Sequence, residues 1–232
     1  MSKKRSISAG LTNQETTWGI VYVLFQTLVL STLLIRGNAR LGSPLTTAEL
    51  NFLYYLVNFL ATILIYHTFL GRNLRQIGQH PAYFCQAVIL GFVAYQACRW
   101  ATTTVAELLV PGFTNHNDAS IANMAASNSF LMGVGTIVLV PLAEECVFRG
   151  LVFRNLYGKS HWAGYCVSIL AFAAIHIAGY VGRYSPLELL LATMQYLPAG
   201  LCLAWSYTKA DTIFAPIVIH AAINFLAYQA LR

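Results

Sequence analysis

The stretch NSFLMGVGTIVLVPLAEECVFRGLVFRNLY, residues 128–157, combines a long apolar run with two adjacent carboxylates, Glu144 and Glu145. It is longer than the about 20 residues that a helix needs to cross the hydrocarbon core of a bilayer. A charge at the centre of such a helix costs about 2.5–3.5 kcal/mol on insertion scales, so two carboxylates there are expected to serve a function. The stretch therefore predicts a membrane helix that carries a polar site.

The composition of the whole chain agrees with a membrane protein. Hydrophobic residues make up 57% of the 232 residues and charged residues 9%, with a mean hydropathy of +0.60. A soluble domain carries about 25% charged residues, so the soluble class is excluded. The net charge of +6 is interpreted as loop Lys and Arg that set membrane orientation, and we expect no nucleic-acid partner.

Seven apolar segments predict an all-α fold, a polytopic membrane helix bundle of about seven transmembrane helices. They span residues 18–35, 50–70, 83–110, 128–157, 162–182, 187–207 and 212–231. The third segment is too long for one straight span and carries Arg99 and Glu107, so we expect its end to emerge from the membrane or to bend along the surface. One continuous membrane domain is expected, with helices 1–3 and an outer loop in residues 1–127 and a four-helix catalytic core in residues 128–232.

The distribution of basic residues predicts the orientation. An N-terminus in the cytoplasm and a C-terminus outside place nine basic residues inside and four outside, which fits the excess of Lys and Arg on the cytoplasmic side. The inside set is Lys3, Lys4, Arg5, Arg72, Arg75, Arg149, Arg154, Lys159 and Lys209, and the outside set is Arg36, Arg40, Arg183 and Arg232. Most other acidic residues, Glu15 among them, lie at segment edges or in loops, where water solvates them.

Helical geometry separates the two glutamates. Arg149 follows Glu145 by four residues, so the two share a helix face and can form an ion pair. Glu144 points about 100° away and remains available as a general base. Pro141 is expected to loosen the helix before the pair and admit water. A purely structural ion pair with Arg149 is the alternative interpretation.

Two histidines lie well inside apolar segments, His176 in AFAAIHIAGY and His220 in APIVIHAAINFL. A buried histidine is more often a hydrogen-bonded core residue than a catalyst, and this alternative stays open for His176. Asn224 follows His220 by four residues on the same face. An imidazole and a carboxamide stacked in this way predict a paired donor site for a developing oxyanion.

Three motifs stand in order along residues 128–231: E-E-x-x-x-R from Glu144 to Arg149, F-x-x-x-H from Phe172 to His176, and H-x-x-x-N from His220 to Asn224. In these motifs, and in EECVFRGLVF and FAPIVIHAAINF around them, the chain resembles the CPBP (CAAX protease and bacteriocin-processing, Abi) family of intramembrane endopeptidases. The resemblance does not extend to the first three helices.

The resemblance implies hydrolysis of a peptide bond within the membrane. It implies that Glu144 and His176 activate a water, that His220 and Asn224 stabilise the oxyanion, and that Glu145, Arg149 and Phe172 support the site. The implied partners are the lipid bilayer and a membrane-associated or prenylated protein or peptide substrate. The small size and short loops favour a prokaryotic cytoplasmic membrane. Neither the substrate nor the oligomeric state follows from the sequence.

Other chemistries remain as alternatives. A zinc site of Glu144, His176 and His220 would leave a position open for water. Because Asn is a poor zinc ligand, and because no H-E-x-x-H motif occurs, a metal-independent mechanism without a cofactor is favoured. Intramembrane Glu, Arg and His also line ion paths in transporters, and an inactive relative could act as a membrane scaffold. The absence of a repeat argues against a transporter, and the presence of all three motif residues argues against a silent scaffold.

Overall fold

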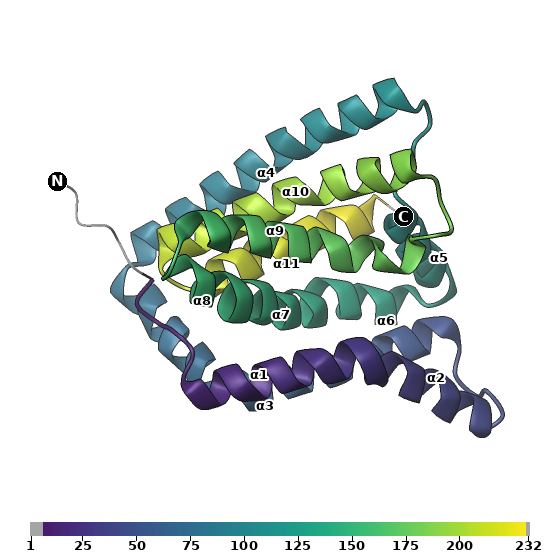
Figure 1. The fold of residues 1–232 in the computed structure, drawn as a ribbon, viewed down its shortest axis with the longest axis horizontal. Coiled ribbons are helices and arrows are strands. Elements are labelled where there is room, and N and C mark those ends of the chain that lie inside the picture. The colour runs from purple at the N-terminus through teal and green to yellow at the C-terminus, as the bar shows by residue number, and fades with distance from the viewer. Residues whose placement is uncertain (1–6, 231–232) are drawn as a thin grey trace.

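The computed structural model of the chain describes residues 7–230, and these residues form helices and connecting loops without a β-strand. Most helices run along the long axis of the molecule, and α4 diverges from the others toward one end (Figure 1). The α-helices are α1 (Asn13–Phe25), α2 (Ser31–Arg40), α3 (Thr47–Gln79), α4 (Pro81–Leu109), α5 (His116–Ser127), α6 (Ser129–Val134), α7 (Val140–Glu145), α8 (Arg154–Tyr157), α9 (His161–Ile177), α10 (Pro186–Ala210) and α11 (Phe214–Gln229). The predicted all-α membrane bundle is confirmed.

Six helical runs among the described residues are long and apolar enough to cross a membrane. They are Asn13–Arg40, Thr47–Gln79, Pro81–Leu109, Ser129–Tyr157, His161–Tyr180 and Pro186–Ala210. The seventh predicted segment is α11, an apolar helix of 16 residues, which is shorter than the about 20 that a straight span requires. The end of α4 does not bend. Its 29 residues form one helix of about 43 Å, which is longer than the hydrocarbon core is thick, so a span along the membrane normal would leave its end outside the core.

The central helix is the continuous run Ser129–Tyr157, which includes α6, α7 and α8. Over its most apolar stretch 56% of the residues are buried, compared with 11% in Asn13–Arg40. Two π-helical segments, Gly135–Leu139 and Cys146–Phe153, lie on either side of α7, which ends in the two glutamates. Such wide turns often mark functional sites, because they re-aim side chains and free backbone groups.

Aromatic and aliphatic side chains pack the C-terminal half of the chain around the central helix. Phe148 of the central helix, Phe172 of α9, Leu203 of α10 and Ile219 of α11 belong to one buried cluster. At Gly200 of α10 the backbone comes so close to α9 that an added Cβ would lie 3.0 Å from Ile169 Cγ2. This packing turns the polar residues of α9 and α11 toward the central helix.

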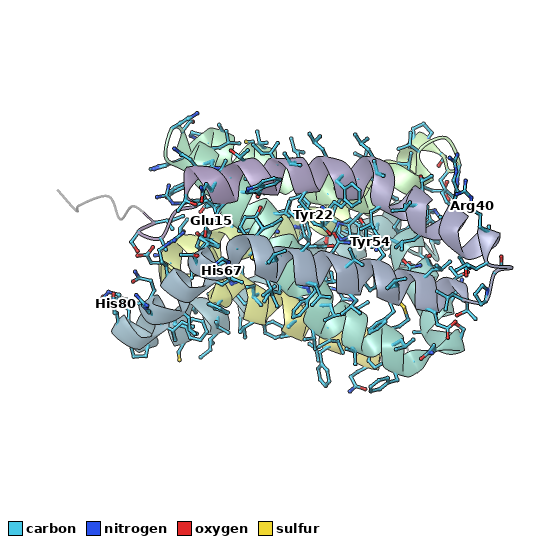
Figure 2. All side chains as sticks on the ribbon, turned by 90° about the horizontal axis from the view of Figure 1, so that it is seen from below. Glu15, Tyr22, Arg40, Tyr54, His67 and His80 are labelled. Carbon is cyan, nitrogen blue, oxygen red and sulfur yellow. The ribbon has the colours of Figure 1, made fainter. Side chains whose placement is uncertain are left out.

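The end of the bundle opposite α5 is closed by the segment before α1. Ile7 is 3% exposed and packs against Cys146, while its carbonyl accepts a hydrogen bond from Arg154 at 2.7 Å. The interpretation of Glu15 as a solvated edge residue is wrong. Its side chain points from α1 toward α3 (Figure 2), is buried, and binds Arg72 Nη2 and the Phe69 N–H, each at 2.7 Å. The sequence position of Glu15 is that of a helix cap, which is usually exposed, but α3 packs against it through Phe69 and Arg72.

Candidate active site

The predicted ion pair between Glu145 and Arg149 is present, and both side chains are fully buried. Arg149 Nη1 donates to Glu145 Oε1 at 3.1 Å, and Arg149 Nε lies 3.1 Å from Glu145 Oε2. Arg149 Nη2 also lies 3.4 Å from the carbonyl oxygens of Ala199 and Gly200 on α10. Arg149 therefore joins the central helix to α10 and does not belong to the loop charges of the inside set.

His220 also binds Glu145. Its Nδ1 lies 2.8 Å from Glu145 Oε1, and the imidazole is buried. A carboxylate paired with a guanidinium is ionised and can only accept, so His220 Nδ1 carries the proton and donates. Nε2 of a neutral His220 is then an acceptor, and it becomes a donor only in the imidazolium form. Glu145 thus fixes the ring of α11 against the central helix.

Asn224 does not hydrogen-bond to His220 in this structure but to the backbone of the central helix. Its Nδ2 donates to the carbonyl oxygen of Thr136 at 2.7 Å. The N–H of Val140 donates to Gly135, five residues back, and in the same register residue 141 would donate to Thr136. Pro141 has no N–H, so it leaves this carbonyl without a backbone partner. Asn224 supplies the missing donor and retains a second N–H.

Glu144 faces α9, the helix that carries His176. Glu144 Oε2 lies 3.9 Å from His176 Nε2, is buried, and has no hydrogen-bond partner among the described residues. His176 Nδ1 lies 2.8 Å from the carbonyl oxygen of Phe172, which can only accept. The proton of a neutral His176 is therefore on Nδ1, and Nε2 presents its lone pair to Glu144. Two acceptors face each other, and a water molecule can donate one hydrogen to each.

Aromatic rings enclose these polar groups. The Phe172 ring lies with its centroid 4.7 Å from that of His176 and 5.9 Å from that of His220, and Arg149 Cζ lies 4.5 Å from the same centroid. Tyr196 of α10 stacks on His176 with centroids 4.3 Å apart. Phe172 was part of the predicted motif. Tyr196 was not predicted, because it lies in a helix that carries no motif.

The structure brings the predicted site residues to one region but in two groups. Glu144 and His176 form one group, and Glu145, Arg149 and His220 form the other, while Asn224 bonds to the central helix. Among residues 7–230, no three His, Cys, Asp or Glu side chains gather closely enough to hold a metal ion. The alternative zinc ligands Glu144, His176 and His220 are therefore not brought together as a three-ligand set.

Comparisons with known proteins point to the same half of the chain. Residues 126–226 match the family model described as type II CAAX prenyl endopeptidase Rce1-like. The UPF0177 protein YxdF of Lactococcus lactis subsp. lactis (strain IL1403) is 24% identical over 95 residues, which are 41% of this chain and 47% of that protein. The matching region thus spans about half the length of this relative. No solved structure matches the chain significantly. Residues 126–226 of this integral membrane protein are therefore similar to the type II CAAX prenyl endopeptidase Rce1-like family.

Proposed function

We propose that the protein is an intramembrane endopeptidase of the glutamate type, which hydrolyses a peptide bond of a membrane-associated or prenylated protein or peptide. The observation that carries the proposal is the pair of facing acceptors, Glu144 Oε2 and His176 Nε2, at 3.9 Å. This spacing suits one water molecule within hydrogen-bond distance of both atoms. The family match adds that proteins with this half of the chain are described as CAAX prenyl endopeptidases.

The chemistry follows from the two acceptors. The water oxygen attacks the carbonyl carbon of the scissile bond while one water proton passes to Glu144, which acts as the general base. The carbonyl oxygen becomes an oxyanion in a tetrahedral intermediate. As the carbon–nitrogen bond breaks, the proton held by Glu144 passes to the leaving amine. His176 keeps the water aligned through its second hydrogen.

His220 and Asn224 are proposed to stabilise the oxyanion, each under a condition that the structure sets. His220 donates from Nε2 only as an imidazolium, because Nδ1 donates to Glu145. Asn224 donates through the N–H that Thr136 does not use. Glu145 and Arg149 act as positioning residues, since their contacts hold His220 and α10 against the central helix.

The substrate class and the membrane are also part of the proposal. The two reacting groups lie within membrane-spanning runs, so the substrate must reach them from the lipid phase or from the membrane surface. We propose a prokaryotic cytoplasmic membrane with the N-terminus inside. The bacterial relative supports the prokaryotic assignment.

Comparative peptidomics of membranes tests the activity even when the substrate is unidentified. Cells that produce the wild-type chain are compared with cells that produce Glu144→Gln or, as a control, Glu107→Gln, whose carboxylate is exposed and binds the Gly112 N–H. Wild type and Glu107→Gln should release the same new peptide termini, and Glu144→Gln should release none of them. Identical termini in all three, at equal protein levels, would refute the proposed activity.

A further inference from the structure

The imidazole of His176 lies near the C-terminal end of its helix. His176 is the second-last residue of α9, and the chain continues as a short 3-10 turn, Ala178–Tyr180. Helix ends fray more easily than helix interiors. The ring is nevertheless fixed from two sides: Phe172 lies on one side with centroids 4.7 Å apart, and Tyr196 stacks with centroids 4.3 Å apart and planes at 27°.

Tyr196 is itself anchored from a distant part of the chain. Its hydroxyl lies 3.3 Å from Asn115 Oδ1 and 3.3 Å from Asp118 Oδ1, so it donates to one or the other. Asn115 is buried, caps the start of α5 through Asn117 N–H, and donates to Gln195 Oε1 at 3.0 Å. The anchor thus belongs to α5 and its cap, which lie outside the family match that begins at residue 126.

We propose that Tyr196 is a positioning residue, which holds the His176 ring in register with Glu144 and is itself held by Asn115 and Asp118. This proposal rests on the proposed function, because the proposed function is what gives His176 a water molecule to align. It also assigns a role to the segment before the catalytic core, which supplies the anchor of a ring that touches the site. A misplacement of a reacting group by about 1 Å can cost about 100-fold in rate.

Kinetics of purified protein in detergent test this role with a substrate from the peptidomics. Tyr196→Leu removes the aromatic face, and kcat should fall about 10-fold to 100-fold while KM stays unchanged, because a positioning residue acts through His176. Tyr196→Phe keeps the aromatic face but loses the hydroxyl that binds Asn115 or Asp118, so its kcat should lie between those of Tyr196→Leu and the wild type. The matched control is Tyr184→Leu, which removes another tyrosine that stacks on a histidine, with its ring centroid 3.4 Å from that of His116, and should leave kcat unchanged.

A second measurement reads the His176 ring without relying on activity. Diethyl pyrocarbonate acylates accessible neutral imidazoles, and mass spectrometry reports the rate at His176. The rate should rise in Tyr196→Leu and stay at the wild-type value in Tyr184→Leu. If the Leu variant yields too little folded protein, Tyr196→Met takes its place, since it fills the site without an aromatic face.

The two measurements separate the two proposals. A wild-type protein that cleaves no substrate contradicts the proposed function, while the acylation rate still reports whether Tyr196 holds the ring. If the wild type is active, a normal kcat in Tyr196→Leu overturns the positioning role. An unchanged acylation rate at His176 in Tyr196→Leu overturns it as well, even if the activity falls through a loss of folded protein.

Discussion

Nδ1 of His220 lies 2.8 Å from Oε1 of Glu145, although 75 residues separate them in the chain. The neighbouring carboxylate, Glu144, instead faces His176 of α9 at 3.9 Å. Two adjacent glutamates of one helix therefore contact two different helices. Glu145 has its charge compensated by Arg149 and a hydrogen bond from His220, whereas Glu144 Oε2 has no hydrogen-bond partner among the described residues. This difference predicts different outcomes when each is changed.

Removing one partner of the buried ion pair should destabilise the protein. In Glu145→Gln the positive charge of Arg149 has no buried counter-charge. In Arg149→Leu the negative charge of Glu145 has none. Loss of one partner of a buried pair costs about 3–5 kcal/mol. The temperature of thermal unfolding in detergent and the amount of folded protein in membranes should both fall for each variant. Arg75→Leu, a change of an exposed arginine, is the control and should behave as wild type.

The double variant Glu145→Gln with Arg149→Leu sharpens this prediction. No buried charge is stranded in it, so it should unfold at a higher temperature than either single variant. If the single variants are as stable as wild type, or if the double variant is less stable than both, the pair does not act as a charge-compensated unit.

Glu144→Gln should fold normally and lose turnover. The substitution keeps the shape of the side chain and removes a charge that no cation balances directly. The temperature of unfolding in detergent should therefore match that of the wild type. A neutral amide does not accept a proton from water, so cleavage of an identified substrate should be abolished. Normal cleavage by Glu144→Gln, together with a folded but inactive Glu145→Gln, would show that the catalytic carboxylate is Glu145.

Asn224 should contribute to stability through the carbonyl of Thr136. Asn224→Ala leaves this buried acceptor without a donor, at a cost of about 1–3 kcal/mol. In Pro141→Ala an N–H becomes available at residue 141, in register with the same carbonyl. The combination of Asn224→Ala with Pro141→Ala should therefore lose less stability than the sum of the two single changes, as measured by thermal unfolding. Strict additivity would contradict the link between Pro141 and Asn224.

The orientation predicted from the basic residues can be measured by reporter fusions after Lys159 and after Arg232. The connection between α8 and α9 and the end of α11 lie at opposite ends of the bundle (Figure 1). The fusions should therefore report opposite sides of the membrane, with Lys159 in the cytoplasm. Fusions that report the same side would mean that α11, with 16 residues, does not carry the chain across.

Much of the architecture could be predicted, because apolar length and helical spacing are local properties of the sequence. The Glu145–Arg149 pair follows from a spacing of four residues within one helix. Contacts between helices depend on packing that no single segment encodes. The sequence alone placed His220 with Asn224, while the structure shows His220 on Glu145 and Asn224 on Thr136. The π-helical turn before Pro141 leaves the carbonyl of Thr136 free for Asn224. Neither this turn nor the stack of Tyr196 on His176 produces a periodic pattern in the sequence.

The metal-independent mechanism stays a prediction, and chelation tests it. The purified protein should keep its activity after prolonged treatment with a strong chelator, because the three candidate zinc ligands do not converge in this geometry. No three His, Cys, Asp or Glu side chains among residues 7–230 gather closely enough to hold a metal ion. Elemental analysis should find no stoichiometric zinc, and thermal unfolding should be the same with and without chelator. Loss of activity on chelation, restored by added zinc, would instead make Glu144, His176 and His220 metal ligands. The site would then have to close around the ion, and the unfolding temperature should rise when zinc is added.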